Sequence, residues 1–97
     1  MNMQSLMAEA NKMQRELKRI NEEIENTTFE GTSSAVKVEM SGKCEIINVN
    51  IIDEEILREK ELLEDMIQLA VNDALRKLNA EKQAKLGKYT GGLGGLF

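Results

Sequence analysis

The sequence predicts an α+β protein in which a long helix, a three-stranded antiparallel meander and a second long helix follow one another, in the order α-β-β-β-α. Near the amino end, apolar residues recur at alternating spacings of three and four, which is the period of a helix. Over residues 36–40 and 46–51 they alternate with polar residues, which is the period of a strand. A second helical stripe of apolar residues follows over residues 62–78.

The first helix is expected to run from about Asn2 to Asn26. Its apolar positions keep a heptad spacing for three repeats, which marks a long helix packed against another helix. At 1.5 Å per residue the helix would be roughly 35 Å long, so a small domain cannot bury the whole seam on its own chain. We therefore expect the helix to protrude or to be covered by a second subunit. The seam consists of Met3, Leu6, Ala10, Met13, Leu17, Ile20 and Ile24.

The middle of the chain is typical of a small sheet. A weaker strand over residues 27–30 is followed by a polar turn region over residues 31–34. Val36, Val38 and Met40 then alternate with polar residues, and a tight turn over residues 41–43 leads into a strand that ends near Ile51. One face of this meander is apolar, so it requires a covering helix.

Asp53 is a good N-cap, and we expect a short turn around residues 56–57 before the second helix, which should run from about Lys60 to Leu86. Its apolar stripe is wide enough for burial on two sides, one against the sheet and one against a partner. Beyond Leu78 the stripe thins, so we expect exposed distal turns. We predict that the dimer interface comprises Leu63, Met66, Ile67, Ala70, Ala74 and Leu78.

Gly87 is expected to end the second helix, and the glycine-rich sequence that follows should be a mobile tail. These features divide the chain into one domain over residues 1–88 and a flexible tail over residues 89–97. A single domain also agrees with the length of 97 residues, and a domain of this size has modest stability without a partner.

The composition argues against an enzyme. Charged residues make up 31% of the chain and aromatic residues 3%, and there is no His, Trp or Pro. Without histidine the commonest general base and metal ligand is missing, and the single Cys44 has no identifiable activating base. The carboxylates at 54–55 and 64–65 are helix neighbours that do not share a face. We therefore expect no catalysis, no metal, no cofactor and no small-molecule substrate.

Cellular location is also constrained. A lone cysteine fits a reducing compartment. The first residues lack the pattern of a secretory signal, and no apolar run approaches the ~20 residues of a membrane helix. These observations lead us to expect a soluble cytoplasmic protein that does not insert into membranes.

Charge is segregated along the chain although the total is only −4. Residues 12–19 carry a net of +3, residues 76–88 a net of +4, and residues 53–65 a net of −5. Each basic segment is either a solvated helix face or a surface for phosphate contacts, which read little sequence. Gln14 lies within the first basic segment and could reach phosphate or a base edge. Because aromatic residues are missing there, stacking on single strands is not expected.

Several stretches, taken in order and spacing, resemble the YbaB/EbfC nucleoid-associated proteins along nearly the whole chain. They are Lys12-Met13-Gln14-Arg15-Glu16-Leu17, Val36-Lys37-Val38 leading to Gly42, Leu63-Glu64-Asp65-Met66-Ile67, Ala70-Val71-Asn72-Asp73-Ala74, and the Gly-Gly-Leu-Gly-Gly-Leu-Phe ending.

The resemblance implies an α-β-β-β-α protomer in an intertwined, tweezer-like homodimer. It also implies binding to double-stranded DNA with little or broad sequence preference, in nucleoid organisation or gene regulation. The alternative is a protein-interaction or assembly module that does not bind DNA directly. In the family the projecting helices contact DNA, and carried over to this chain the candidates are Lys12, Gln14, Arg15, Lys18, Arg19, Arg76, Lys77, Lys82 and Lys85.

Overall fold

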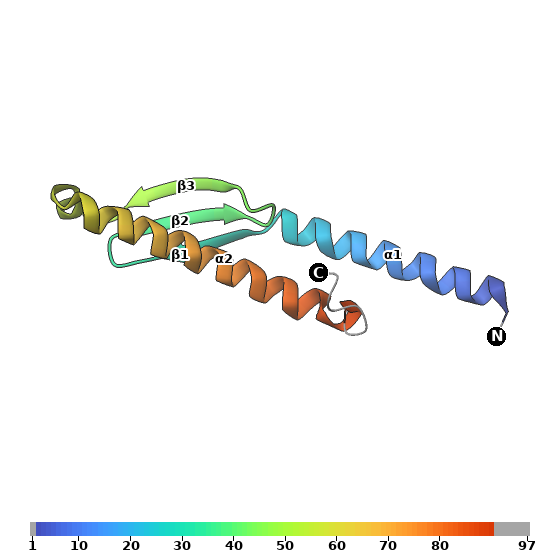
Figure 1. The fold of residues 1–97 in the computed structure, drawn as a ribbon. Coiled ribbons are helices and arrows are strands. Elements are labelled where there is room, and N and C mark those ends of the chain that lie inside the picture. Colours follow the sequence, from blue (N-terminus) through green and yellow to red (C-terminus); the bar gives the residue numbers. More distant parts are fainter. Residues whose placement is uncertain (1, 91–97) are drawn as a thin grey trace.

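The computed structural model describes residues 2–90 and shows an elongated molecule measuring 69 × 23 × 14 Å. A long helix projects from one end of a body made of a sheet and a second long helix (Figure 1). This order confirms the predicted α-β-β-β-α fold. The elements are α1 (Met3–Glu25), β1 (Thr28–Thr32), β2 (Val36–Ser41), β3 (Ile46–Ile51), a 3₁₀ turn η1 (Glu54–Arg58) and α2 (Lys60–Thr90).

Local signals set the ends of α1. The Oδ1 of Asn2 accepts a hydrogen bond from the Ser5 backbone N–H at 2.8 Å, which satisfies one of the free donors of the first turn. At the other end, the Asn26 N–H donates to the Glu22 carbonyl oxygen at 3.1 Å. Only Ile20 and Ile24 of the apolar seam are buried, whereas Met3 and Met13 keep 74% and 50% exposure. Within its own chain, α1 therefore protrudes as an arm.

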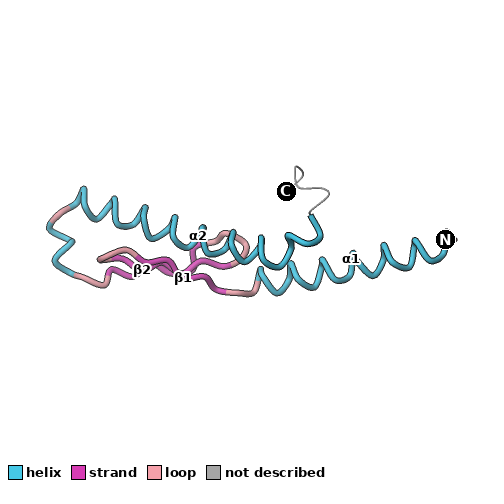
Figure 2. Tube along the Cα trace, turned by 90° about the horizontal axis from the view of Figure 1, so that it is seen from below, coloured by secondary structure: helices cyan, strands magenta, loops and turns pink. Residues whose placement is uncertain are grey.

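The sheet is an antiparallel meander in the order β1-β2-β3, as predicted. Phe29 of β1 pairs with Met40 of β2, and Val38 of β2 pairs with Val49 of β3. Helix α2 lies along one face of this sheet (Figure 2), where Val36 and Val38 are completely buried. The sheet and α2 together form the core predicted from the alternating pattern.

A glycine allows α2 to approach β1 closely. A Cβ built on Gly31 would collide with the backbone of Ala70 and Ala74, so only glycine permits this helix-to-strand distance. Ala70, Ala74 and Leu78 are fully buried in this contact. They were also predicted to lie in a dimer interface, and in the single chain their neighbours in the core cover them completely. The other three predicted interface residues, Leu63, Met66 and Ile67, are half-buried around the same core.

Strand β3 has less cover than the sequence pattern suggested. Helix α2 packs against β1 and β2, leaving Ile46, Ile47 and Val49 between 45% and 57% exposed. Val49 pairs with the buried Val38 and therefore lies on the side of the sheet that α2 covers elsewhere. One covering helix thus suffices for only part of the apolar face.

The carboxyl end of α2 differs from the prediction. The helix passes through Gly87 to Thr90, and its distal turns are not simply exposed, because Leu86 and Tyr89 pack against the cluster that contains Ile20 and Ile24. The tertiary contact compensates for the low helix propensity of glycine. The expected boundary at residues 88–89 therefore falls inside the helix, and the rest of the predicted tail, residues 91–97, lies outside the described residues.

The remaining local predictions agree with the structure. Asp53 caps η1 by accepting a hydrogen bond from the Glu55 N–H at 3.0 Å, and η1 leads directly to α2. No helix within residues 2–90 is both long enough and apolar enough to cross a bilayer.

Candidate functional site

The first basic segment lies on the projecting part of α1. At about 100° per residue, Lys12, Arg15, Lys18 and Arg19 fall within an arc of about 120° on the side of the helix opposite the apolar seam. All four are exposed, and Gln14 is exposed beside them. The heptad pattern thus produces two faces on one rod, an apolar face and a basic face.

Three of these four cations have no acidic partner. Arg19 Nη1 lies 2.7 Å from Glu23 Oε1 one turn further along the helix. Lys12, Arg15 and Lys18 make no ion pair with any carboxylate of residues 2–90. Unpaired cations on a protruding helix are available to an external anion without first giving up an internal contact.

The second basic segment, on α2, is arranged differently. Arg76 Nη2 lies 2.7 Å from Asp73 Oδ1, and Lys77 Nζ lies 3.3 Å from Asp73 Oδ2. Lys77 Nζ also donates a hydrogen bond to the Glu30 carbonyl oxygen on β1 at 2.7 Å. Lys85 pairs loosely with Glu81 at 3.8 Å, and Lys82 is half-buried. Most of the positive charge on α2 is therefore already matched inside the molecule.

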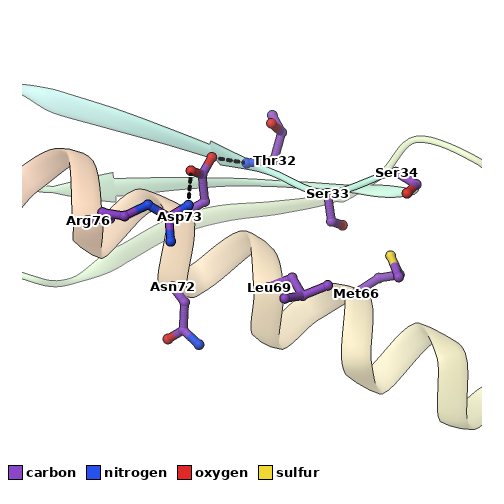
Figure 3. Close-up of a pocket in the computed structure, with 8 residues that line it drawn as sticks. All are labelled: Thr32, Ser33, Ser34, Met66, Leu69, Asn72, Asp73 and Arg76. Atoms are coloured by element: carbon purple, nitrogen blue, oxygen red, sulfur yellow. Dashed lines mark hydrogen bonds and ion pairs between the residues drawn. The ribbon is translucent and has the colours of Figure 1, made fainter.

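Asp73 is the centre of this arrangement (Figure 3). It accepts a hydrogen bond from the Thr32 backbone N–H at 3.0 Å, at the end of β1. That hydrogen bond, together with Lys77 and Arg76, holds the pKa of Asp73 below its ordinary value, although partial desolvation opposes the shift. The carboxylate is thus ionised at neutral pH and links β1 to α2.

This role of Asp73 was not predicted, although the sequence contains a signal for it. Acidic and basic residues three and four apart on a helix are the usual spacing for ion pairs, and Asp73 stands at that spacing from Arg76 and Lys77. The contacts with Glu30 and Thr32 cross more than forty residues of sequence and had no such signal.

The hollow beside Asp73 offers no reactive arrangement. It measures about 370 Å³ and lies between the β1–β2 turn and α2 (Figure 3). Its charged groups, Asp73 and Arg76, are bound to one another. Within residues 2–90 no group of three or more His, Cys, Asp or Glu side chains is placed to hold a metal ion.

The acidic and basic parts of the chain lie at opposite ends of the molecule. The acidic segment of residues 53–65 forms η1 and the start of α2, which lie at the far end from the amino terminus of α1 (Figure 1). Anions are thus attracted toward residues 12–19 of α1, which carry a net of +3, and repelled from the η1 end, which carries a net of −5.

Comparison with known proteins gives a consistent result. The YbaB/EbfC DNA-binding family model matches residues 1–93. A nucleoid-associated protein of Lactococcus lactis subsp. cremoris is 46% identical over 99 aligned positions, covering 96% of this chain and 97% of that protein. A nucleoid-associated protein of Agathobacter rectalis is 41% identical, covering 97% of this chain and 86% of that protein.

A crystal structure of an uncharacterized Helicobacter pylori protein has the same fold. It superimposes with a TM-score of 0.73 at 22% identity, covering 87% of this chain and 91% of the other.

Proposed function

The chain belongs to the YbaB/EbfC DNA-binding family, and from this premise we propose that it binds double-stranded DNA as a homodimer through the basic face of α1. The observation that carries the proposal is the set of three unpaired cations, Lys12, Arg15 and Lys18, on a helix that projects beyond the body. Gln14 and the exposed part of Arg19 border this set. Cations of this kind contact phosphates along the DNA backbone.

Binding through phosphates explains how an acidic protein holds a polyanion. The net charge of −4 belongs mainly to the η1 end, which faces away from the α1 arm. Because such contacts carry little base information, the expected sequence preference is weak or broad. They also release counterions, so affinity should fall steeply as salt rises.

The cations of α2 have a smaller part in this proposal. Arg76 and Lys77 would have to give up their ion pairs with Asp73 in order to bind a phosphate. The net gain in binding free energy from such an exchange is small. Lys82 and Lys85 lie closer to the arm and are secondary candidates.

The proposed homodimer forms over β3 rather than over the predicted α2 residues. Ile46, Ile47 and Val49 are exposed apolar side chains on an edge strand, a feature that soluble proteins normally cover. A second copy would bury them and would double the number of free cations to six. Two projecting arms on one dimer agree with the tweezer-like arrangement that the resemblance implies.

The proposed biological role is nucleoid organisation or gene regulation, in the cytoplasm at the nucleoid, and without catalysis. It is supported by the name "nucleoid-associated protein" that the relatives in Lactococcus and Agathobacter carry. A protein-interaction module without direct DNA binding is the second candidate, and the exposed apolar residues of β3 and α1 favour it.

The two candidates are separated by fluorescence-anisotropy titration of duplex DNA at several salt concentrations. Six neutralised phosphates per dimer predict a slope of log affinity against log salt of about −5, since each contributes about −0.9. Two duplexes of unrelated sequence should give similar slopes. Failure to retain DNA at low salt, together with a stoichiometric protein partner in pull-downs, would favour the interaction module.

A further inference from the structure

We propose that Asp73 and Lys77 of α2 close the outer edge of β1 to pairing with another strand, so that this chain can extend its sheet only at β3. The inference concerns sheet pairing and depends neither on DNA binding nor on the proposed dimer. It rests on the direction in which the backbone groups of β1 point, on the side chains that α2 places against them, and on the contrast with β3.

The sheet has two outer edges, one on β1 and one on β3. An outer edge offers unpaired N–H and C=O groups to any other strand, so it is a route to association between chains. On β1, the backbone groups of Thr27 and Ser33 bond on the β2 side, and this direction alternates from one residue to the next. The groups that point outward therefore belong to Thr28, Glu30 and Thr32.

Two of these outward groups are already bound by side chains of α2. The Thr32 N–H donates to Asp73 Oδ2 at 3.0 Å (Figure 3), and Lys77 Nζ donates to the Glu30 carbonyl oxygen at 2.7 Å. Asp73 thus stands where a carbonyl oxygen of an added strand would accept. Lys77 stands where an N–H of that strand would donate.

The spacing of the two side chains matches the spacing of the strand. Asp73 and Lys77 are four residues apart on α2, or about 6 Å along the helix axis. Thr32 and Glu30 are two residues apart on β1, or about 6.8 Å in an extended strand. Lys77 Nζ also lies 3.3 Å from Asp73 Oδ2, so each side chain holds the other beside the edge. A pair of side chains on one helix turn can therefore replace two successive hydrogen bonds of a neighbouring strand.

The body of α2 does not cover this edge. The helix lies over the face of β1, where Gly31 allows its close approach, whereas Thr28, Glu30 and Thr32 are exposed. A hollow of about 370 Å³ opens at Thr32, between the β1–β2 turn and α2. Because there is room beside β1, the edge is closed by the two charged side chains and not by the bulk of the helix.

Strand β3 has no comparable protection. No side chain of residues 2–90 makes a hydrogen bond to its backbone. The strand itself, Ile46–Ile51, contains no charged residue. Charged side chains, lysine above all, are a usual means of protecting an edge strand from pairing. One edge of the sheet is therefore protected and the other is open.

This difference sets a limit on assembly. A chain with one open edge pairs once, and the combined sheet then ends at a protected β1 on each side. A chain with two open edges can pair at both and form an open-ended array, which is the course of edge-to-edge aggregation. Asp73 and Lys77 therefore determine where the sheet can grow, which is a role separate from any contact with DNA.

The first test removes the two side chains from the full-length protein and measures size by sedimentation velocity at several concentrations. Lys77→Met frees the Glu30 carbonyl oxygen, and the double variant Asp73→Ala, Lys77→Met frees both strand groups without changing the net charge. Both variants should form species of at least about twice the mass of the natural protein, since a second open edge joins at least two of its units. The proportion of these species should rise with protein concentration.

Arg76→Met is the matched control. It removes one positive charge and introduces the same side chain as Lys77→Met, but Arg76 bonds to Asp73 and makes no hydrogen bond to β1 within residues 2–90. This variant should keep the size of the natural protein. Equal enlargement of the control, or natural size in Lys77→Met and in a folded double variant, would overturn the proposal. If circular dichroism shows that the double variant is unfolded, Lys77→Met decides alone, because Lys77 is 52% exposed and its replacement leaves the core intact.

Amide hydrogen exchange then identifies the edge at which the enlarged species form. The N–H groups of Thr28 and Glu30 point outward from the sheet, so pairing at β1 should slow their exchange relative to the natural protein. Enlarged species in which both amides exchange as fast as before have formed by another route and contradict the proposal. The size of the natural protein in the same runs tests the proposed dimer separately. A natural monomer that pairs on Lys77→Met would refute the dimer over β3 and still support the closure of β1.

Discussion

The two basic segments of this molecule carry similar net charge, but they differ in how many of their cations form ion pairs inside the molecule. Residues 12–19 carry a net of +3 and residues 76–88 a net of +4, so charge counting favours the second. In the structure the order is reversed, because α1 presents three unpaired cations whereas Arg76 and Lys77 of α2 share the Asp73 carboxylate. The charge available to a ligand is what remains after internal partners are counted.

The difference has a simple origin in the fold. Helix α2 lies on the sheet, where the Glu30 carbonyl oxygen of β1 and the Asp73 carboxylate of the helix itself are within reach of its cations. The outer part of α1 meets the end of α2 through the Tyr89–Glu16 hydrogen bond, and its Lys12, Arg15 and Lys18 side chains are exposed. Packing on the sheet thus gives the cations of α2 internal partners, whereas those of α1 remain unpaired.

The largest loss of DNA affinity is expected when the free cations of α1 are removed. Changing Lys12, Arg15 and Lys18 to Gln should weaken binding to any duplex by at least ~100-fold near physiological salt and bring the salt slope close to zero. All three side chains are exposed, so the thermal midpoint should change little. Anisotropy titrations of two unrelated duplexes measure the effect, and a binding loss confined to one duplex would contradict phosphate recognition.

The next largest effect is expected from the proposed dimer contact. Val49→Asp places a charge in the β3 surface and should convert the protein to monomers, as measured by analytical ultracentrifugation. Because each monomer carries half of the free cations, the salt slope should fall from about −5.4 to about −2.7. Asn48→Asp is the matched control: the adjacent position pairs with Glu39 on the other side of the sheet. A dimer that survives Val49→Asp would move the interface elsewhere.

A change at the distal end of α2 tests its contact with α1. Gly87 is helical, and among the described residues the nearest atom that a Cβ added there would meet is Gln83 Nε2 at 4.0 Å. Gly87→Ala should therefore raise the free energy of unfolding by about 0.5–1 kcal/mol. Chemical denaturation provides the measurement, and DNA affinity should be unaffected. A destabilised variant would show that this turn is not helical in solution.

The paired cations of α2 should matter least for DNA binding. Changing Arg76 and Lys85 to Gln should lower affinity by less than ~3-fold and alter the salt slope by less than one unit per chain. The same titration that detects the α1 triple variant provides the scale. An effect as large as that of the α1 variant would reverse the comparison.

Asp73 gives the α2 segment a pH signature that α1 lacks. Its pKa is lowered in the folded state, chiefly by the Thr32 N–H, so its contribution to stability is present above the unfolded pKa of about 3.9 and disappears as pH falls through the lower folded value. Asp73→Asn should have a lower thermal midpoint than the natural protein at pH 7, and the two midpoints should converge below pH 4. A constant difference across this range would contradict the assigned role.

Much of the fold was predictable because the local spacing of apolar residues indicates the type of each element. The seam spacing predicted α1, and the alternation around Val38 predicted β2 and its neighbours. The α2 terminus was not predictable, because Leu86 and Tyr89 stabilise it through contacts with α1 that are distant in sequence.

The sequence was sufficient to identify the candidate basic residues, but not to predict which of them remain unpaired. The basic residues could be found by counting charges, and the spacing of Asp73 from Arg76 already indicated an ion pair. Which cations remain free depends on where β1 passes α2, and on the close approach that Gly31 allows. The same approach buries Ala70 and Ala74 within the single chain, which the sequence pattern alone did not indicate.

The most direct test of the central claim is an amide and guanidinium NMR titration of the full-length protein with a short duplex. If the unpaired cations of α1 bind DNA, the first and largest shifts will occur at residues 12–19, including the Arg15 side chain, while the signals of Arg76 and Lys77 stay in place. Shifts centred on residues 73–85, with residues 12–19 unchanged, would contradict it.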